Sequence, residues 1–295
     1  MKLHLPAVMS LAAGLCLGAL NLGAAEVTQG RVGRGPSFKG PVGLQLYSLR
    51  DSFKADVPGS FNKVRNLGFK YVELAGTYGQ SNVAFTQTLK QYGLVPIAAH
   101  FPFEKFQTDP EGIAREAKEL GLKFAGCAWI PHQGDFDEKL CREAAGVFNR
   151  AGETLAKHGL KFFYHVHGYE FQPWRNGTLF DLLMEETNPK NVVYEMDIFW
   201  VVFPGQDPVK LLNKYGKRWQ LMHLKDMKKD VKLGSLSGGT DVRNDVALGA
   251  GQIDLPPLLR AARKVGVKWY FIEDESPSVE IQLPVSLRFL ESVRF

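Results

Sequence analysis

The amino-acid sequence predicts a single α/β domain in which eight parallel strands, each followed by a helix, close into a (β/α)8 TIM barrel. Apolar stretches of strand length alternate with helical patterns between residues 42 and 273. Glycines recur where a helix ends, two or three residues before the next strand, at positions 68, 93, 121, 159, 216 and 266. No Gly-x-Gly-x-x-Gly turn follows the first strand, which argues against an open dinucleotide-binding sheet.

The first four strands occupy residues 42–130. They are short apolar runs that end in polar or turn residues, as expected of strands buried on both faces. The helices between them each stop at one of the recurrent glycines. We predict strands at Val42–Tyr47, Tyr71–Leu74, Val95–His100 and Phe124–Ile130, and helices at Pro58–Leu67, Phe85–Tyr92 and Glu111–Leu120.

The last four strands occupy residues 161–273, after a long helix at Glu138–His158. The run from Phe162 to Phe171 is apolar and aromatic at first and then turns polar abruptly, with His165 and His167 two residues apart. A glycine-rich loop is expected over residues 228–252. We predict strands at Lys161–Val166, Val192–Asp197, Trp219–Leu224 and Lys268–Glu273, and helices at Leu179–Glu186, Pro208–Tyr215 and Leu255–Val265.

The N-terminal segment is typical of an export signal. Lys2 supplies a positive charge, Leu5–Leu22 is apolar and interrupted by Gly and Ser, and Gly23-Ala24-Ala25 is a small-residue cleavage site. We therefore expect residues 1–25 to be a signal peptide, residues 26–40 a flexible lead-in and residues 41–295 the barrel. The mature protein would be exported, either periplasmic or secreted, and would not remain in the membrane.

Composition narrows the possible partners. The chain has 295 residues and a formal net charge of +5 without a long basic block, so we expect no nucleic-acid partner. Cys127 and Cys141 could form one disulfide, but the three cysteines of the chain match no cysteine zinc motif. A homo-oligomer is compatible with the sequence.

Polar residues close six of the predicted strands. Because the strand ends of a barrel meet at one mouth, these imidazoles and carboxylates would converge there and form a divalent metal site. Packing alone is a poor explanation, since burying unpaired charges costs several kcal/mol each. The residues are Glu73, His100, His165 with His167, Glu195 with Asp197, His223 with Lys225 and Asp226, and Glu273 with Asp274 and Glu275.

Several motifs resemble the xylose isomerase-like TIM-barrel superfamily, within it the sugar phosphate isomerase/epimerase subgroup. They are Gly-Leu-Gln-Leu-Tyr-Ser-Leu-Arg from residue 43, Tyr-His-Val-His-Gly-Tyr-Glu-Phe from residue 164, Glu-Met-Asp-Ile-Phe-Trp from residue 195, Met-His-Leu-Lys-Asp-Met from residue 222, Leu-Gly-Ala-Gly-Gln-Ile-Asp-Leu from residue 248 and Phe-Ile-Glu from residue 271. The resemblance covers roughly residues 42–293.

The resemblance implies one divalent ion held at the ends of the fifth to eighth strands. Asp197, His223 and Glu273 match the last three ligands, and His165 stands where the ketose epimerases of the superfamily have a glutamate. We prefer His165 over His167 because it lies nearer the strand body, although the sequence leaves both open. Mn²⁺, Co²⁺, Ni²⁺ or Zn²⁺ would suit two imidazoles and two carboxylates.

Such a site could grip the neighbouring hydroxyl and carbonyl of a sugar and favour a metal-bound enediolate. We expect Glu73, His100, His167 and Glu273 to act as acids or bases and Lys225 to stabilise the oxyanion. The candidate substrate-binding residues are Trp129, Tyr169, Trp200 and Asp226.

Three functions remain open at this point. The first is a metal-dependent sugar isomerase or epimerase that acts through the enediolate. The second is a lyase that cleaves 3-keto-glycosides by elimination at the same site, which the histidine at position 165 and the export signal favour. The third is a sugar-binding barrel without turnover. In each case the partner is a small sugar or keto-glycoside.

Overall fold

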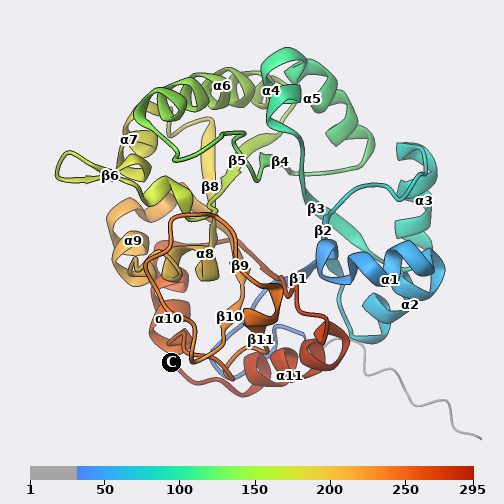
Figure 1. The fold of residues 1–295 in the computed structure, drawn as a ribbon. Coiled ribbons are helices and arrows are strands. Elements are labelled where there is room, and N and C mark those ends of the chain that lie inside the picture. The colour runs from blue at the N-terminus through green and yellow to red at the C-terminus, as the bar shows by residue number, and fades with distance from the viewer. Residues whose placement is uncertain (1–31) are drawn as a thin grey trace, which may run out of the picture.

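The computed structural model, which describes residues 32–295, confirms the predicted eight-stranded barrel. All neighbouring strands of the barrel run parallel, and β1 closes the ring by pairing with β12 on one side and β2 on the other. Figure 1 looks roughly along the barrel axis, with the helices outside the strands. The barrel strands are β1 (Val42–Gln45), β2 (Tyr71–Leu74), β3 (Val95–His100), β4 (Phe124–Cys127), β5 (Lys161–His165), β8 (Val192–Asp197), β9 (Trp219–Leu224) and β12 (Trp269–Ile272).

The helices form the outer layer. The recurrent glycines at 68, 93, 121, 159, 216 and 266 all adopt positive φ, as the helix–glycine–strand pattern predicts. Aspartates begin several helices; Asp137, for example, accepts a hydrogen bond from the Leu140 amide at 2.8 Å. The helices are α1 (Arg50–Ala55), α2 (Val57–Asn66), α3 (Asn82–Gln91), α4 (Phe103–Thr108), α5 (Pro110–Glu119), α6 (Glu138–Lys157), α7 (Leu179–Glu186), α8 (Ile198–Val202), α9 (Pro208–Tyr215), α10 (Leu255–Val265) and α11 (Val279–Ser292).

An apolar layer fills the inside of the barrel. Two glycines make room for it, because a Cβ added at Gly126 would lie 2.4 Å from the Phe163 ring and one added at Gly43 would lie 2.8 Å from the Phe271 ring. This layer closes the barrel beneath the strand ends. Its buried residues are Ile97, Ala98, Phe124, Phe163, Val193, Leu221 and Phe271.

The strands are shorter than predicted at several ends. β1 stops at Gln45 because the Gln45 side chain accepts a hydrogen bond from the Tyr47 amide at 3.0 Å and starts a 3-10 turn. Two short hairpins were not predicted. They are β6 (Pro173–Trp174) with β7 (Gly177–Thr178), and β10 (Asp226–Met227) with β11 (Asp245–Val246), which divides the expected 228–252 loop.

Part of the expected flexible lead-in is packed on the barrel. Phe38 is buried and contacts the Tyr270 ring edge-on, with 5.1 Å between ring centroids, and the Ser37 hydroxyl accepts a hydrogen bond from the Phe295 amide. The signal peptide predicted for residues 1–25 lies outside the described residues. No helix within residues 32–295 is long and apolar enough to span a membrane. Cys127 and Cys141 are buried free thiols, so the possible disulfide is not formed.

Candidate metal centre

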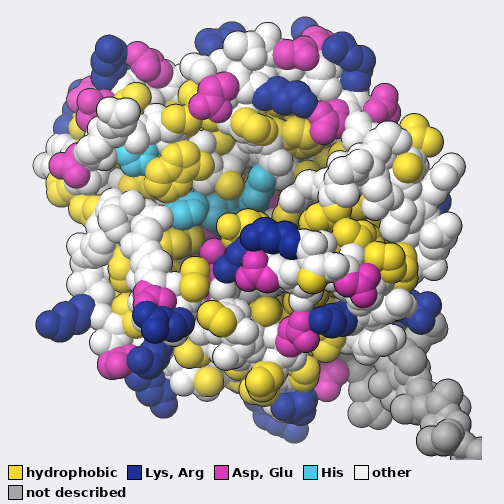
Figure 2. Space-filling model, turned by 45° about the vertical axis from the view of Figure 1, so that its right-hand side comes forward, with side chains coloured by type: hydrophobic (Ala, Val, Ile, Leu, Met, Phe, Trp, Pro, Cys, Tyr) yellow, Lys and Arg dark blue, Asp and Glu magenta, His cyan; other side chains and the backbone are white. Residues whose placement is uncertain are grey.

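A layer of polar side chains lies directly above the apolar layer. Side chains alternate along a strand, so residues two positions beyond the apolar layer point inward again. Figure 2 shows histidine side chains gathered in the hollow at the centre of this face. The barrel strands other than β4 each contribute one residue to this layer: Gln45, Glu73, His100, His165, Glu195, His223 and Glu273, all buried except the partly exposed His100.

Four of these strands bring together the predicted metal ligands. Nε2 of His165 lies 3.1 Å from Nδ1 of His223, which lies 3.0 Å from a Glu273 oxygen. Oδ2 of Asp197 is 3.4 Å from the His165 nitrogen and 3.6 Å from the His223 nitrogen. One donor atom from each of the four residues lies within 4.8 Å of the other three. This spacing suits ligands arranged around a single ion.

The donor set fits a divalent cation. Asp197 uses Oδ1 to accept the Phe199 and Trp200 amides at the start of α8, whereas its buried Oδ2, which faces the histidines, has no hydrogen-bond partner. A buried carboxylate oxygen without a partner is costly, and a cation would satisfy it. Two nitrogen and two oxygen donors suit Mn²⁺, Co²⁺, Ni²⁺ or Zn²⁺.

The second ring nitrogen of His223 faces two carboxylates of the same layer. Its Nε2 lies 2.5 Å from a Glu73 oxygen and 3.3 Å from a Glu195 oxygen, and both carboxylates are fully buried. Burial alone would raise the pKa of Glu73, but the nearby His100 and His223 lower it below its usual value. Burial and the Glu73 carboxylate raise the pKa of Glu195 well above its usual range. A proton on Nε2 leaves Nδ1 free to bind a metal.

His100 and His167 line the cavity above the ligand cluster. This cavity of about 360 Å³ is also lined by His165, Trp200 and Glu273. Nε2 of His100 lies 3.2 Å from a Glu195 oxygen, so a buried carboxylate orients the ring. The His167 ring stacks on Trp200 with 4.6 Å between centroids. Burial and the adjacent His165 lower the pKa of His167 to about 3, which keeps the imidazole neutral.

The loop after β5 is fixed by Glu170. This fully buried carboxylate accepts the His167 amide at 2.9 Å and the Gly168 amide at 2.7 Å, and the Tyr164 hydroxyl also donates to it. Burial raises the pKa of Glu170 despite these bonds. Glu170 therefore holds the backbone that carries His167.

Lys225 is enclosed by carboxylates. Its ammonium group lies 2.8 Å from Glu275 and 3.2 Å from Glu273, with Asp197 and Asp245 within 4 Å. Burial disfavours the charged form, but these carboxylates, Asp245 most strongly, raise the pKa of Lys225 well above its usual value. Lys225 does not line the cavity, so its direct effect is to position Glu273 and Asp197.

Asp226, a predicted substrate-binding residue, binds backbone amides of the protein itself. One of its oxygens accepts the amides of Gly249 and Gly251, both at 2.9 Å, and the other accepts the Met227 amide at 2.8 Å and the Ile253 amide at 3.2 Å. The side chain is buried and does not line the cavity. Asp226 therefore holds the end of the long loop after β9 against the end of that strand.

The aromatic candidates take different positions. Trp200 lines the cavity, Trp129 is 40% exposed beside it, and Tyr169 is fully buried, where its hydroxyl accepts the Ile130 amide at 2.8 Å. Tyr169 thus supports the wall and does not reach the cavity. Gln45, Tyr47 and Glu275 also line the cavity, although the sequence analysis assigned them no role. Glu195, likewise without an assigned role, orients His100. The side-chain alternation that placed Asp197 also points Glu195 inward.

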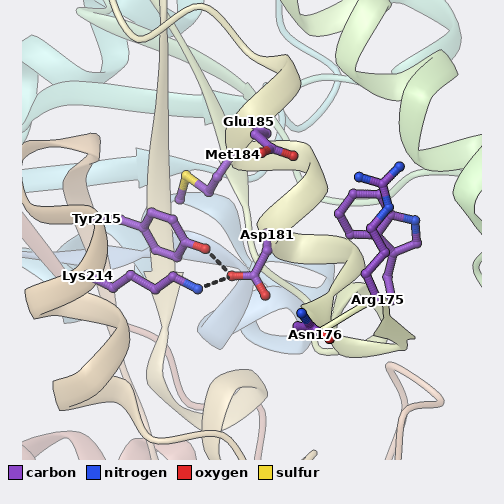
Figure 3. A pocket seen from close by; sticks show the side chains of 9 residues that line it. Arg175, Asn176, Asp181, Met184, Glu185, Lys214 and Tyr215 are labelled. Atoms are coloured by element: carbon purple, nitrogen blue, oxygen red, sulfur yellow. Dashed lines mark hydrogen bonds and ion pairs between the residues drawn. The ribbon is translucent and has the colours of Figure 1, made fainter.

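A larger cavity of about 480 Å³ lies away from the strand ends, beside the β6–β7 hairpin, α7 and α9. Figure 3 shows its Asp181 carboxylate bonded to Lys214 and Tyr215, so this carboxylate is already paired. Arg175 stacks over Trp174 at 4.2 Å and covers that ring. The cavity within the barrel mouth is therefore the candidate functional site.

Comparison with known proteins agrees with this geometry. The profile described as "Xylose isomerase-like TIM barrel" matches residues 61–293, which is most of the chain and includes all four predicted ligands. The protein belongs to the xylose isomerase-like TIM-barrel family. The sequence resemblance is thus confirmed at the family level.

The curated relatives of this family member include proteins named inosose dehydratase. The one from Clostridium beijerinckii is 27% identical over 239 residues, 70% of this chain and 78% of its own. The one from Clostridium botulinum (strain Alaska E43 / Type E3) is 29% identical over 75% of this chain and 83% of its own. The match to Geobacillus thermodenitrificans is 31% identical and spans only about half of either protein, 50% of this chain and 51% of the relative.

Solved structures share the fold at low sequence identity. A sugar phosphate isomerase/epimerase from Parabacteroides distasonis has a TM-score of 0.72 at 23% identity, covering 85% of this chain and 93% of its own. The IOLI protein, whose structure contains a bound zinc atom, has a TM-score of 0.65 at 15% identity, covering 85% of this chain and 95% of its own.

Proposed function

We propose that the protein is a divalent-metal-dependent lyase that removes a leaving group from a polyhydroxy ketone by elimination next to the carbonyl. The observation that carries this proposal is the donor set at the barrel mouth. His165 is one of the four ligands and Glu273 is the single glutamate among them, and the cavity above the cluster is lined by His100 and His167. The inosose dehydratase names of the relatives support the same reaction class.

The ligand set favours elimination over epimerisation. Epimerisation by two glutamates places one carboxylate on each face of the reacting carbon, as the family resemblance implies. This chain has a histidine in the first of those positions. Elimination needs one base for the C–H proton and one acid for the leaving group, which Glu273 and a cavity histidine can supply.

A divalent ion held by His165, Asp197, His223 and Glu273 would polarise the substrate carbonyl and make the neighbouring C–H bond more acidic. The chain then supplies the proton transfers. The Glu273 carboxylate takes the proton from the carbon beside the carbonyl, and the electron pair of that C–H bond forms the new double bond. Protonated His100 gives its proton to the hydroxyl on the next carbon, which leaves as water.

Isomerisation or epimerisation is the second candidate, because it begins with the same proton removal and uses the same Asp197, His223 and Glu273 positions. The two reactions differ in the fate of the intermediate. Returning the proton to carbon gives an isomer of unchanged mass, whereas loss of the leaving group gives an unsaturated product and water or an alcohol.

The test is product analysis on the metal-loaded protein. Incubation with an inosose and with a 3-keto-glycoside, followed by NMR and mass spectrometry, should show a product lighter by one water or the free aglycone. An isomer of unchanged mass would establish the second candidate. Saturable binding without any product would establish a non-catalytic sugar-binding barrel.

A further inference from the structure

The loops after β9 and β12 decide whether the site can hold a phosphate. In (β/α)8 barrels a phosphate is commonly gripped by the loops after the seventh and eighth strands and by a nearby helix N-terminus. In this barrel those loops follow β9 and β12, and the second one leads into α11. Their free amides and cations would have to bind the phosphate oxygens.

The amides after β12 are already bonded within the protein. Asp245 occupies the Glu275 amide, because its Oδ2 accepts a hydrogen bond from that amide at 2.8 Å. Asp245 is 5% exposed, and its oxygen accepts this bond in either protonation state. The flanking amides, of Asp274 and Ser276, donate to the Ser48 hydroxyl at 3.0 Å and to the Asp274 carboxylate at 2.9 Å.

Three amides at the end of the loop after β9 are occupied in the same way. The Asp226 carboxylate accepts the Gly249, Gly251 and Ile253 amides, as described above. The two glycines that could otherwise form an anion-binding turn thus face an acid of the chain itself. The Gly249, Gly251 and Ile253 amides are therefore not free to bind a phosphate.

The nearest cations are also engaged. Lys225 is surrounded by carboxylates and does not line the cavity. Arg50 donates to the Tyr47 carbonyl at 3.3 Å and to the Glu275 carbonyl at 2.8 Å, and its guanidinium stacks on the Tyr47 ring. The cavity lining contains the carboxylates of Glu273 and Glu275 and neither lysine nor arginine.

The remaining lining groups suit hydroxyls. Gln45 uses its side-chain oxygen to accept the Tyr47 amide, which leaves its amide nitrogen as a donor. Tyr47 is 44% exposed at the rim, and His100 and His167 are imidazoles that can donate or accept. Neutral donors and acceptors next to acidic groups recognise a polyol better than a phosphate dianion.

We propose that the site takes an uncharged polyhydroxy ketone and rejects its phosphorylated counterpart, with Asp245 and Glu275 as the specificity-determining residues. The proposal rests on the proposed function, because only that function requires the substrate to be a ketone. Asp245 closes the amide that a phosphate would use, and Glu275 places a negative charge on the cavity wall.

The test is calorimetric binding of an inosose and of its monophosphate ester to the metal-loaded protein. The ester should bind at least about tenfold more weakly than the inosose, because no lysine or arginine lines the cavity and the phosphate would lie beside the Glu275 carboxylate. Equal or tighter binding of the ester, or binding of neither compound, overturns the proposal. Selective binding of the inosose without turnover would sustain the proposal and remove the lyase assignment.

Three variants test the named residues. Asp245→Ala frees the Glu275 amide and Glu275→Gln removes the wall charge, so each should narrow the preference for the inosose about threefold or more. Asp245→Asn keeps an acceptor oxygen and should reduce the ratio of inosose affinity to ester affinity by less than Asp245→Ala does. Thermal melts identify variants that fail to fold, and the two residues would lose this role if every folded variant kept the wild-type ratio of the two affinities.

Discussion

His223 shows how one residue can organise the whole site. Its Nδ1 faces His165, Asp197 and Glu273, and its Nε2 faces Glu73 and Glu195. A histidine that binds a metal through one nitrogen is commonly held by a carboxylate at the other, which fixes its tautomer. We therefore assign Glu73, predicted as an acid or base, to positioning His223, since it is fully buried and does not line the cavity.

Replacing Glu73 should weaken metal binding without removing the ligands. Glu73→Gln keeps the size of the side chain but can turn an amide donor toward Nε2. We expect the affinity for Co²⁺ or Zn²⁺ to fall about 10–100-fold, the usual effect of losing such a partner. Competition with a chelating dye measures it, and Glu153→Gln on the surface of α6 is the control. Unchanged affinity would return Glu73 to the list of candidate bases.

The metal-ligand residues could be predicted from the sequence because strand ends and alternating side chains determine where they meet. The contributions of Glu195, Glu275 and Asp245 could not be assigned in the same way. Glu195 and Glu275 lie beside residues with equally suitable chemistry, and only their distances to His100 and Lys225 show what they do. Asp245 lies 19 residues after Asp226 and reaches Lys225 only because β10 and β11 pair.

At the scale of elements, the loop after β5 depends on a buried carboxylate. Glu170 accepts the amides of His167 and Gly168, and Gly168 adopts a φ of 96° that a side chain would strain. The sequence predicted a polar strand end here but gave no sign that Glu170 turns inward. The result is a rigid position for His167 above the ligand cluster.

Glu170→Gln should separate loop geometry from metal binding. The glutamine amide would face the donors that the carboxylate now accepts, which leaves buried groups unpaired at a cost of about 1–3 kcal/mol. We expect a lower melting temperature and reduced turnover with unchanged metal content, because His165 lies on the strand before this loop. Loss of the metal along with activity would show that the loop also shapes the ligand cluster.

At the scale of the whole molecule, the packing inside the barrel depends on a glycine in β4. A Cβ at Gly126 would lie 2.4 Å from the Phe163 ring inside the barrel. Gly126→Ala should therefore destabilise the fold by about 1–3 kcal/mol through overpacking. Gly146→Ala on α6 is the matched control, since its Cβ would meet only the Arg150 side chain at 3.5 Å. An equal free energy of unfolding for the two variants, measured with denaturant, would mean that the apolar layer rearranges to admit the extra methyl group at little cost.

The eight-strand order, the helix-ending glycines and the single domain were predictable because each follows from local patterns. The two hairpins and the packing of Phe38 were not, since they depend on contacts between segments distant in sequence.

Export remains a prediction at this scale. We propose that residues 1–25 are removed, so that the mature chain begins at Glu26. Mass spectrometry of protein recovered from the medium or periplasm should give this N-terminus. Recovery of exported protein with an intact Met1 would rule out cleavage, and retention inside the cell would rule out export.

The most direct test of the metal centre is metal content, measured by plasma mass spectrometry after dialysis, in wild type, His223→Ala and the His158→Ala control. His223 supplies a donor to the cluster and holds its place through Glu73, whereas His158 pairs with Glu111 away from the cavity. We expect about one divalent ion per chain in wild type and in His158→Ala, and none in a folded His223→Ala protein. Equal metal content in all three would contradict the proposed metal site at His165, Asp197, His223 and Glu273.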